Sequence, residues 1–514
     1  MAATFGSTLC GFFREVVNAR YFGTQWEMDT FLAAATIPTI LFGVFNGALV
    51  SALVPTFSEY LSQGAHEEAV RLASTIANVL AIALSILAVL GWYLAPAFVP
   101  LVAHGFPPGQ MGVAVHMTRW LMPSIVATSL AGVASAVLNA QHRFNSSALG
   151  GIAVNIATIA AVLFLFPKLG IFALVLGSTL GLTAQLIVQL PSIVALRMWR
   201  PVIDLHHPGL QRIGAMLGPI VVGSAAGQVA LFFDRYFAST LSPGYMAGMN
   251  YAVKLVGFPQ QIFAAAIATV IFPLLASQFA TANRVGIRQS VVMGLRMVNF
   301  ITIPAVCALF ALATPIVQTL FERGAFQASA TQLCAGLLPY SAVGLVALAA
   351  NVVLTRCAFA CRETRATVVV SIVTVVLNVV LSVIWLGPLG ARGLLLANSV
   401  SQSVQAILLS LIIWRLLGGI EWRTIGRSAV GIIACSLVMV SALHWIASLG
   451  AAPPETFGER AWFLVGQIAI AALVFLAATQ LVGVEEPAIA LRLIMKKFEG
   501  RVPNPPEGRE VPIA

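Results

Sequence analysis

The chain is a succession of long apolar segments separated by short connections that are charged or rich in proline and glycine. A helix needs about 20 mainly apolar residues to cross the hydrocarbon layer of a membrane, and peptide groups there must hydrogen-bond within the segment. We expect fourteen such helices, or thirteen if the first segment, with its internal charges, does not cross. They lie near 3–23, 29–57, 70–102, 113–140, 147–166, 170–196, 212–241, 246–279, 289–320, 331–358, 366–386, 390–415, 425–448 and 461–483. The pattern predicts an all-α, polytopic membrane protein.

The composition excludes a soluble globule. Of the 514 residues, 59% are hydrophobic and 9% are charged, whereas a soluble domain carries about 25% charged residues. The net charge of +10 does not indicate nucleic acid, because the basic residues lie between apolar segments rather than on one patch. Among six scattered cysteines, Cys357 and Cys361 are four residues apart, but no further Cys or His stands nearby at a zinc-like spacing. We interpret them as buried small hydrophobic residues.

The distribution of basic residues predicts the orientation. Cytoplasmic loops carry an excess of Lys and Arg, and here the even-numbered connections carry eleven arginines against four basic residues in the odd-numbered ones. With an even number of spans, both termini are expected in the cytoplasm. No small-residue cleavage pattern follows the first segment, so we expect that segment to be retained.

The chain contains an internal duplication. Residues 19–60 parallel residues 234–279, since each copy has Arg-Tyr-Phe followed by two spaced prolines, and residues 143–170 parallel residues 364–390. The offset stays between 215 and 223 residues, about six helices, so both copies keep the same orientation. Parallel repeats of this kind commonly form a transporter with the substrate site at their interface.

The repeats predict a domain organisation. We expect a first six-helix lobe at 1–200, a second at 201–420, two additional helices at 421–490 and a cytoplasmic tail at 491–514. The proline-rich end of that tail is typical of a disordered extension.

Ionisable residues inside the apolar segments are candidates for substrate binding. Each costs about 2.5–3.5 kcal/mol to insert. Arg14 and Lys254 could offer positive charge to an anionic headgroup, as a bidentate guanidinium and a point-charge ammonium. Glu15 could hold Arg14 in place, and Asp29 opens the second segment. The alternative is that these charges pair with one another or reach the membrane interface.

Several motifs carry a family resemblance. "GFFREVVNARYFG" with "MDTFLAAATIP", then "NYAVKL", "FERGAF" and "CRETRATV", follow one another between residue 5 and about 410. In order and spacing they resemble the MurJ/MviN family of lipid-linked peptidoglycan precursor flippases, within the multidrug/oligosaccharidyl-lipid/polysaccharide exporters. The resemblance implies a flippase for lipid II, an undecaprenyl-pyrophosphate-linked disaccharide pentapeptide, in the bacterial cytoplasmic membrane.

The family pattern is incomplete in this chain. Arg14 and Glu15 match its first-helix charges, but Lys254 and Val253 replace an arginine and an acid. Phe42 and Gly43 stand where an arginine pair is usual. Two of about four expected cations are therefore present.

The resemblance also implies a candidate sodium site. Some relatives hold a sodium ion in the second lobe, and the matching positions are Asp234, Asn378, Ser382 and Asn398, with Ser382 in place of a carboxylate. A hard cation takes several oxygen ligands. The alternative is that the asparagines hydrogen-bond between helices.

These features favour a lipid flippase that works by alternating access, driven by the membrane potential or an ion gradient and without a bound cofactor. No phosphate-cradling GxxxxGK[ST] loop is present. The implied partners are a lipid-linked anionic glycan, membrane lipids and cell-wall assembly proteins, with no nucleic acid. The alternatives are another polyprenyl-linked oligosaccharide or a drug cation as substrate, a membrane-embedded glycosyltransferase, and a non-transporting scaffold derived from a flippase.

Overall fold

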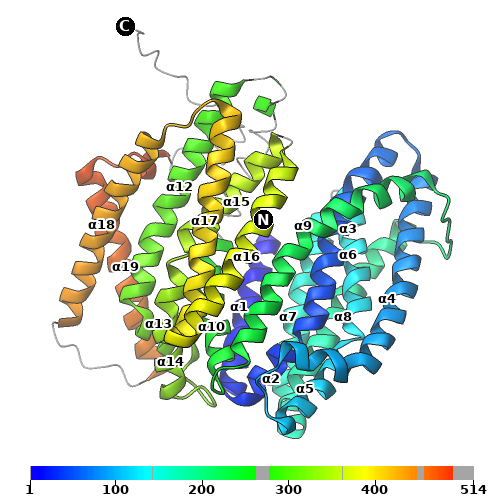
Figure 1. The fold of residues 1–514 in the computed structure, drawn as a ribbon, viewed down its shortest axis with the longest axis horizontal. Helices are drawn as coiled ribbons and strands as arrows, with labels where there is room; N and C mark the ends of the chain where they lie inside the picture. The colour runs from blue at the N-terminus through cyan, green and yellow to red at the C-terminus, as the bar shows by residue number, and fades with distance from the viewer. Residues whose placement is uncertain are drawn as a thin grey trace. The chain divides into compact units, whose positions relative to one another are not determined.

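The computed structural model describes residues 2–141, 143–261, 277–279, 281, 283–361, 363–448 and 456–489, and their regular structure is helical throughout (Figure 1). The first ten helices are α1 (Ala2–Phe22), α2 (Trp26–Ala34), α3 (Thr36–Ser62), α4 (His66–Val102), α5 (Pro108–Leu121), α6 (Ser124–Ala140), α7 (Phe144–Leu169), α8 (Phe172–Ala195), α9 (Pro208–Ala238) and α10 (Tyr245–Pro259). The remainder are α12 (Arg284–Ala311), α13 (Ala313–Phe321), α14 (Ala328–Ala342), α15 (Leu345–Ala360), α16 (Thr364–Leu389), α17 (Ala391–Leu417), α18 (Trp422–Ser448) and α19 (Phe457–Val482).

The all-α, multi-pass fold is confirmed. Among the described residues, ten helical stretches are long and apolar enough to cross a membrane, or eleven if α14 and α15, bent by 44°, form one span. The number fourteen and the domain boundaries stay predictions, and the tail at 491–514 lies outside the described residues.

Two of the predicted segments are each split into two helices for the same reason. The segment 29–57 divides at Ala35 into α2 and α3, and 289–320 divides at Leu312 into α12 and α13. Pro38 and Pro315 lie just beyond these breaks. A proline ring clashes with the carbonyl four residues earlier, which here belongs to the last residue of the preceding helix.

The chain forms two compact units. Unit 1 comprises Met1–Tyr251, Leu320–Leu337 and Ser371–Ala397, and unit 2 comprises Ala252–Thr319, Leu338–Val370 and Asn398–Ala514. In unit 1, fully buried Leu53, Phe57 and Leu72 pack α3 against α4 and α6.

In unit 2, α12 packs against α15, α18 and α19. An ion-pair cluster reinforces this packing, because Arg296 of α12 bonds through Nε to Glu486 at 2.6 Å and through Nη2 to Glu485 at 3.1 Å. Ser428 of α18 donates a second hydrogen bond to the buried Glu486 carboxylate. The segment after α19 is thus fastened to both helices.

Candidate functional site

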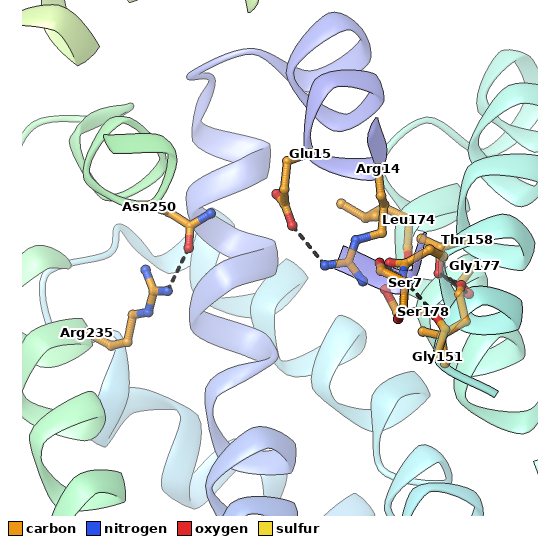
Figure 2. Close-up of polar contacts among 12 residues, drawn as sticks. Ser7, Arg14, Glu15, Gly151, Thr158, Leu174, Gly177, Ser178, Arg235 and Asn250 are labelled. Carbon is orange, nitrogen blue, oxygen red and sulfur yellow. Dashed lines mark hydrogen bonds and ion pairs between the residues drawn. The ribbon is translucent and has the colours of Figure 1, made fainter. Parts of the chain in front are cut away.

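A charged pair lies in the middle of α1. Arg14 Nη2 lies 2.8 Å from Glu15 Oε1, and the Arg14 side chain keeps 28% of its exposure while the Glu15 side chain keeps 9% (Figure 2). The pairing agrees with the predicted role of Glu15, which is to hold Arg14. A guanidinium has five N–H donors, so the bond to Glu15 leaves Arg14 with capacity for an anion.

Asp29 joins the first repeat to the second. Its side chain is buried, and its two carboxylate oxygens accept hydrogen bonds from the backbone N–H groups of Gly244 at 2.6 Å and Ala247 at 2.7 Å. These donors belong to the start of α10, where unpaired N–H groups and the helix dipole favour a negative charge. In this conformation Asp29 therefore acts as a cap for α10.

Four helix connections meet at the same end of unit 1. Gly105 of the α4–α5 connection donates its N–H to Ser239 Oγ at 3.3 Å, and Ala325 of the α13–α14 connection donates its N–H to Arg20 O at 2.8 Å. Each bond links one repeat to the other. The other two connections are α1–α2 and α9–α10. Each of the four contains one glycine, and we call these glycines the glycine seam: Gly23, Gly105, Gly244 and Gly324.

The glycine seam is packed too closely for any side chain. A Cβ added to Gly105 would overlap Ser239 O, and one added to Gly324 would overlap Arg20 O. Gly244 has a φ of 90°, which other residues rarely adopt, and its Cβ would overlap Thr24 O. Main-chain atoms of the connections therefore touch directly at this end.

A second polar pair lies between α9 and α10. Arg235 Nη2 donates to Asn250 Oδ1 at 3.2 Å, next to the half-buried Asp234 in the chain (Figure 2). Arg235 occupies the position of Arg20 in the duplication. Asn250, Tyr251 and Asn18 were not among the predicted site residues.

Buried polar atoms mark these missed positions. Tyr251 is 0% exposed and its hydroxyl has no hydrogen-bond partner among the described residues, and the same holds for Oδ1 of the buried Asn18. Their only sequence signal is a polar atom within an apolar helix. That signal is weak, because most such atoms bond to a neighbouring helix.

Lys254 belongs to unit 2 and is exposed on α10. Its approach to Arg14, which belongs to unit 1, stays a prediction.

The candidate sodium ligands are divided between the units. Asn378 and Ser382 are buried on α16 in unit 1, where Ser382 Oγ donates to Asn378 Oδ1 at 3.1 Å. Asp234 also belongs to unit 1, whereas Asn398 belongs to unit 2. The matching asparagine of the first repeat, Asn155, bonds α7 to α1 through Ser7 O at 3.3 Å. A sodium site at these residues stays a prediction.

Apolar spanning helices, a duplication and polar pairs inside the helices define a membrane transporter. Solved structures with this fold include an inward-facing multidrug resistance MATE family transporter of the MOP superfamily, with a TM-score of 0.69 at 15% identity over 80% of this chain and 94% of that one. A structure of the lipid II flippase MurJ in an inward closed conformation reaches a TM-score of 0.78 at 23% identity over 97% and 99% of the two chains.

Sequence comparison gives the family. The family model described as lipid II flippase MurJ matches residues 18–453. The lipid II flippase MurJ of Burkholderia cenocepacia is 31% identical over 458 residues, which cover 86% of this chain and 87% of the relative. The chain belongs to the MurJ family of lipid II flippases, as the motifs predicted. It is a multi-pass membrane protein of a transporter family and not of an enzyme family.

Proposed function

We propose that this chain translocates lipid II across the bacterial cytoplasmic membrane. Family membership over residues 18–453 supports this function. The structural observation that supports it is Arg14, a partly exposed cation in the middle of α1 that is paired with the Glu15 carboxylate. The remaining N–H donors of its guanidinium are of the kind that bind a pyrophosphate.

The proposed substrate site combines Arg14 with Lys254. Arg14 would bind the pyrophosphate in bidentate fashion, and Lys254 would add a second positive charge. Glu15 orients Arg14. Asp29 acts indirectly by holding the start of α10, which is the helix that carries Lys254 five residues before its end at Pro259. Entry of the headgroup between the lobes leaves the polyprenyl tail in the lipid.

The glycine seam supports transport by alternating access. Its four connections are odd-numbered in the predicted topology, so they lie at the non-cytoplasmic end when both termini are cytoplasmic. Closure there suits a state that receives the substrate from the cytoplasm. Release to the outside then requires Asp29 to leave the start of α10 and the connections to separate.

The energy source is the membrane potential or a sodium gradient, and moving one charge through 100 mV supplies about 2.3 kcal/mol. Asp234, Asn378, Ser382 and Asn398 are the proposed sodium ligands. Cell-wall assembly proteins are the proposed protein partners, since they consume the translocated precursor.

A translocation assay tests the substrate site. Cells depleted of their own flippase would express the chain with Arg14→Ala or Lys254→Ala, and the lipid II accessible at the outer leaflet would be measured. Lys168→Ala is the matched control, because Lys168 is an exposed cation at the end of α7. We expect at least a tenfold loss of translocation for Arg14→Ala and no loss for the control. Full translocation by the double variant Arg14→Ala/Lys254→Ala would contradict pyrophosphate capture by this pair.

One observation favours a second candidate, the flipping of a different polyprenyl-linked oligosaccharide. Where the family pattern has arginines, this chain has Phe42 and Gly43, and the Gln228 side chain of α9 occupies the space beside Gly43 that a Cβ would need. A site with fewer cations suits a substrate with less negative charge. Competition between lipid II and neutral-headed or monophosphate-linked analogues in the same assay would distinguish the two substrates.

A further inference from the structure

The outward face of α4 and α5 carries a group of aromatic and basic side chains outside the proposed transport site. We call it the Arg119 cluster, and it consists of Arg119, His116 and Trp120 of α5 with Trp92 and Tyr93 of α4. The aromatic members are unusually open for their size, with Tyr93 67%, Trp120 50% and Trp92 42% exposed. Trp92 and Tyr93 meet edge to face with their ring centroids 5.0 Å apart.

This face has the composition of a lipid-facing surface. Both helices belong to stretches long and apolar enough to span one. Large aliphatic side chains surround the cluster along α4, all of them at least half exposed: Ile82, Ile86, Val89, Leu90, Leu94 and Leu101. An apolar surface of this kind, with no described element packed over it, is the surface that a membrane helix turns toward acyl chains.

Arg119 carries a charge on this face without a carboxylate to balance it. Its Nε donates to Trp92 O at 3.1 Å, and its Cζ lies 4.7 Å from the Trp92 ring centroid. No ion pair among the described residues includes Arg119. Neither α5 nor α8 contains an acid, and the acids of α4 are in its first turn, about two dozen residues from Trp92. A charge in this setting is costly unless an anion joins it.

The Arg119 cluster lies inside the hydrocarbon core and on the side of the α4–α5 connection. Arg119 is eleven residues from the start of α5 and Trp92 is ten from the end of α4, so both Cα atoms lie about 15–17 Å from the connection at a rise of about 1.5 Å per residue, within a core about 30 Å thick. At this depth an unpaired guanidinium draws a lipid phosphate inward by local thinning of the bilayer, and helix side chains tilt toward the N-terminus, which directs Arg119 toward the connection and its headgroups. His116 lies one turn nearer the connection on the same helix face, edge-on to Phe172 at 5.1 Å between ring centroids.

We propose that the Arg119 cluster binds the phosphate of a resident anionic phospholipid of the outer leaflet. The cation–π contact with Trp92 fixes the guanidinium, and its two Nη groups are left to form a bidentate contact with a phosphodiester. His116 supplies a further donor, and Tyr93 and Trp120 pack against the glycerol and upper acyl chains. The site uses none of the residues proposed for transport, so it stands independently of the transported substrate.

Lipid titration followed by native mass spectrometry tests the proposal on the purified full chain. Phosphatidylglycerol and phosphatidylcholine with the same acyl chains would be compared for the wild-type chain, Arg119→Gln and Arg119→Lys. Arg392→Gln is the matched control, because Arg392 is an exposed arginine at the start of α17 on the same predicted side. We expect a preference for phosphatidylglycerol that falls about tenfold in Arg119→Gln, partly recovers in Arg119→Lys and is unchanged in the control.

Three results would overturn the proposal. The first is an unchanged preference in Arg119→Gln, and the second is equal binding of the two phospholipids by the wild-type chain. The third is binding of undecaprenyl pyrophosphate at the cluster with no binding of phosphatidylglycerol, which would assign the site to the transported lipid. If Arg119→Gln unfolds in detergent, Trp92→Leu serves as the second variant, because it removes the cation–π contact and leaves the charge. The same loss of preference is then expected, and its absence counts against the site.

Discussion

Replacing Asp29 with asparagine should open the closed end of unit 1. The carboxylate accepts two backbone hydrogen bonds at 2.6 and 2.7 Å from the first turn of α10. Asparagine keeps one acceptor oxygen but turns an amide NH2 toward the other N–H. It also removes the negative charge that the helix dipole favours. Because a hydrogen bond to a charged group is worth about 1.5–3 kcal/mol, the closed state should lose about 3 kcal/mol.

A loss of about 3 kcal/mol changes the ratio of closed to open molecules by roughly 100-fold. Spin labels at Gln25→Cys and Ser242→Cys, both exposed beside the glycine seam, would report the opening after the six native cysteines are replaced. Electron–electron double resonance should give a longer, broader distance distribution in Asp29→Asn than in the parent protein. Glu67→Gln is the control, because the Glu67 side chain is 85% exposed in the first turn of α4. Identical distributions for the parent and Asp29→Asn would refute the assignment of Asp29 as the residue that holds this end closed.

Two further changes test other parts of the chain. Glu486→Gln removes the ion pair with Arg296 and should lower the free energy of unfolding by about 1–3 kcal/mol, measured by thermal unfolding in detergent. Burial raises the pKa of Glu486, but the hydrogen bonds from Arg296 and Ser428 more than offset this and leave it below its usual 4.5. The stabilisation should therefore be complete above pH 4.5 and be lost as the pH falls through the lowered pKa. If the wild-type chain remains more stable to unfolding than Glu486→Gln at a pH below the lowered pKa, the ionised Glu486 carboxylate is not the source of the stabilisation. Gly43→Arg should leave translocation nearly unchanged, because the atoms that the new side chain meets belong to the flexible amide end of Gln228, which can move aside. A loss of translocation in Gly43→Arg that Gln228→Ala restores would contradict this and show that the two positions compete for space.

The fold was predictable because hydropathy is a property of whole segments. Among the described residues, most of the predicted segments correspond to one helix, and two are divided into helix pairs beside a proline, Pro38 and Pro315. The count was harder, because α1 contains Arg14, Glu15 and Arg20 within 21 residues and falls outside the ten stretches that are apolar enough by composition alone.

The site was predictable only as far as residue types allow. Charge within an apolar segment was sufficient to select Arg14 and Asp29, but it could not separate their roles. The partners of Asp29 are backbone N–H groups 215 and 218 residues away, and any sequence supplies such groups at a helix start. The seam glycines were equally hidden, since their requirement comes from a neighbouring carbonyl and not from their own chemistry.

The direct contact between main chains at the glycine seam has a consequence for how the molecule moves. Each connection rests on the backbone of another, so no single loop is free to lift while the others stay in place. Asp29 is a buried carboxylate at that junction, and the α13–α14 connection also carries Glu322 and Arg323. Opening should accordingly be a concerted step in which all four connections separate together.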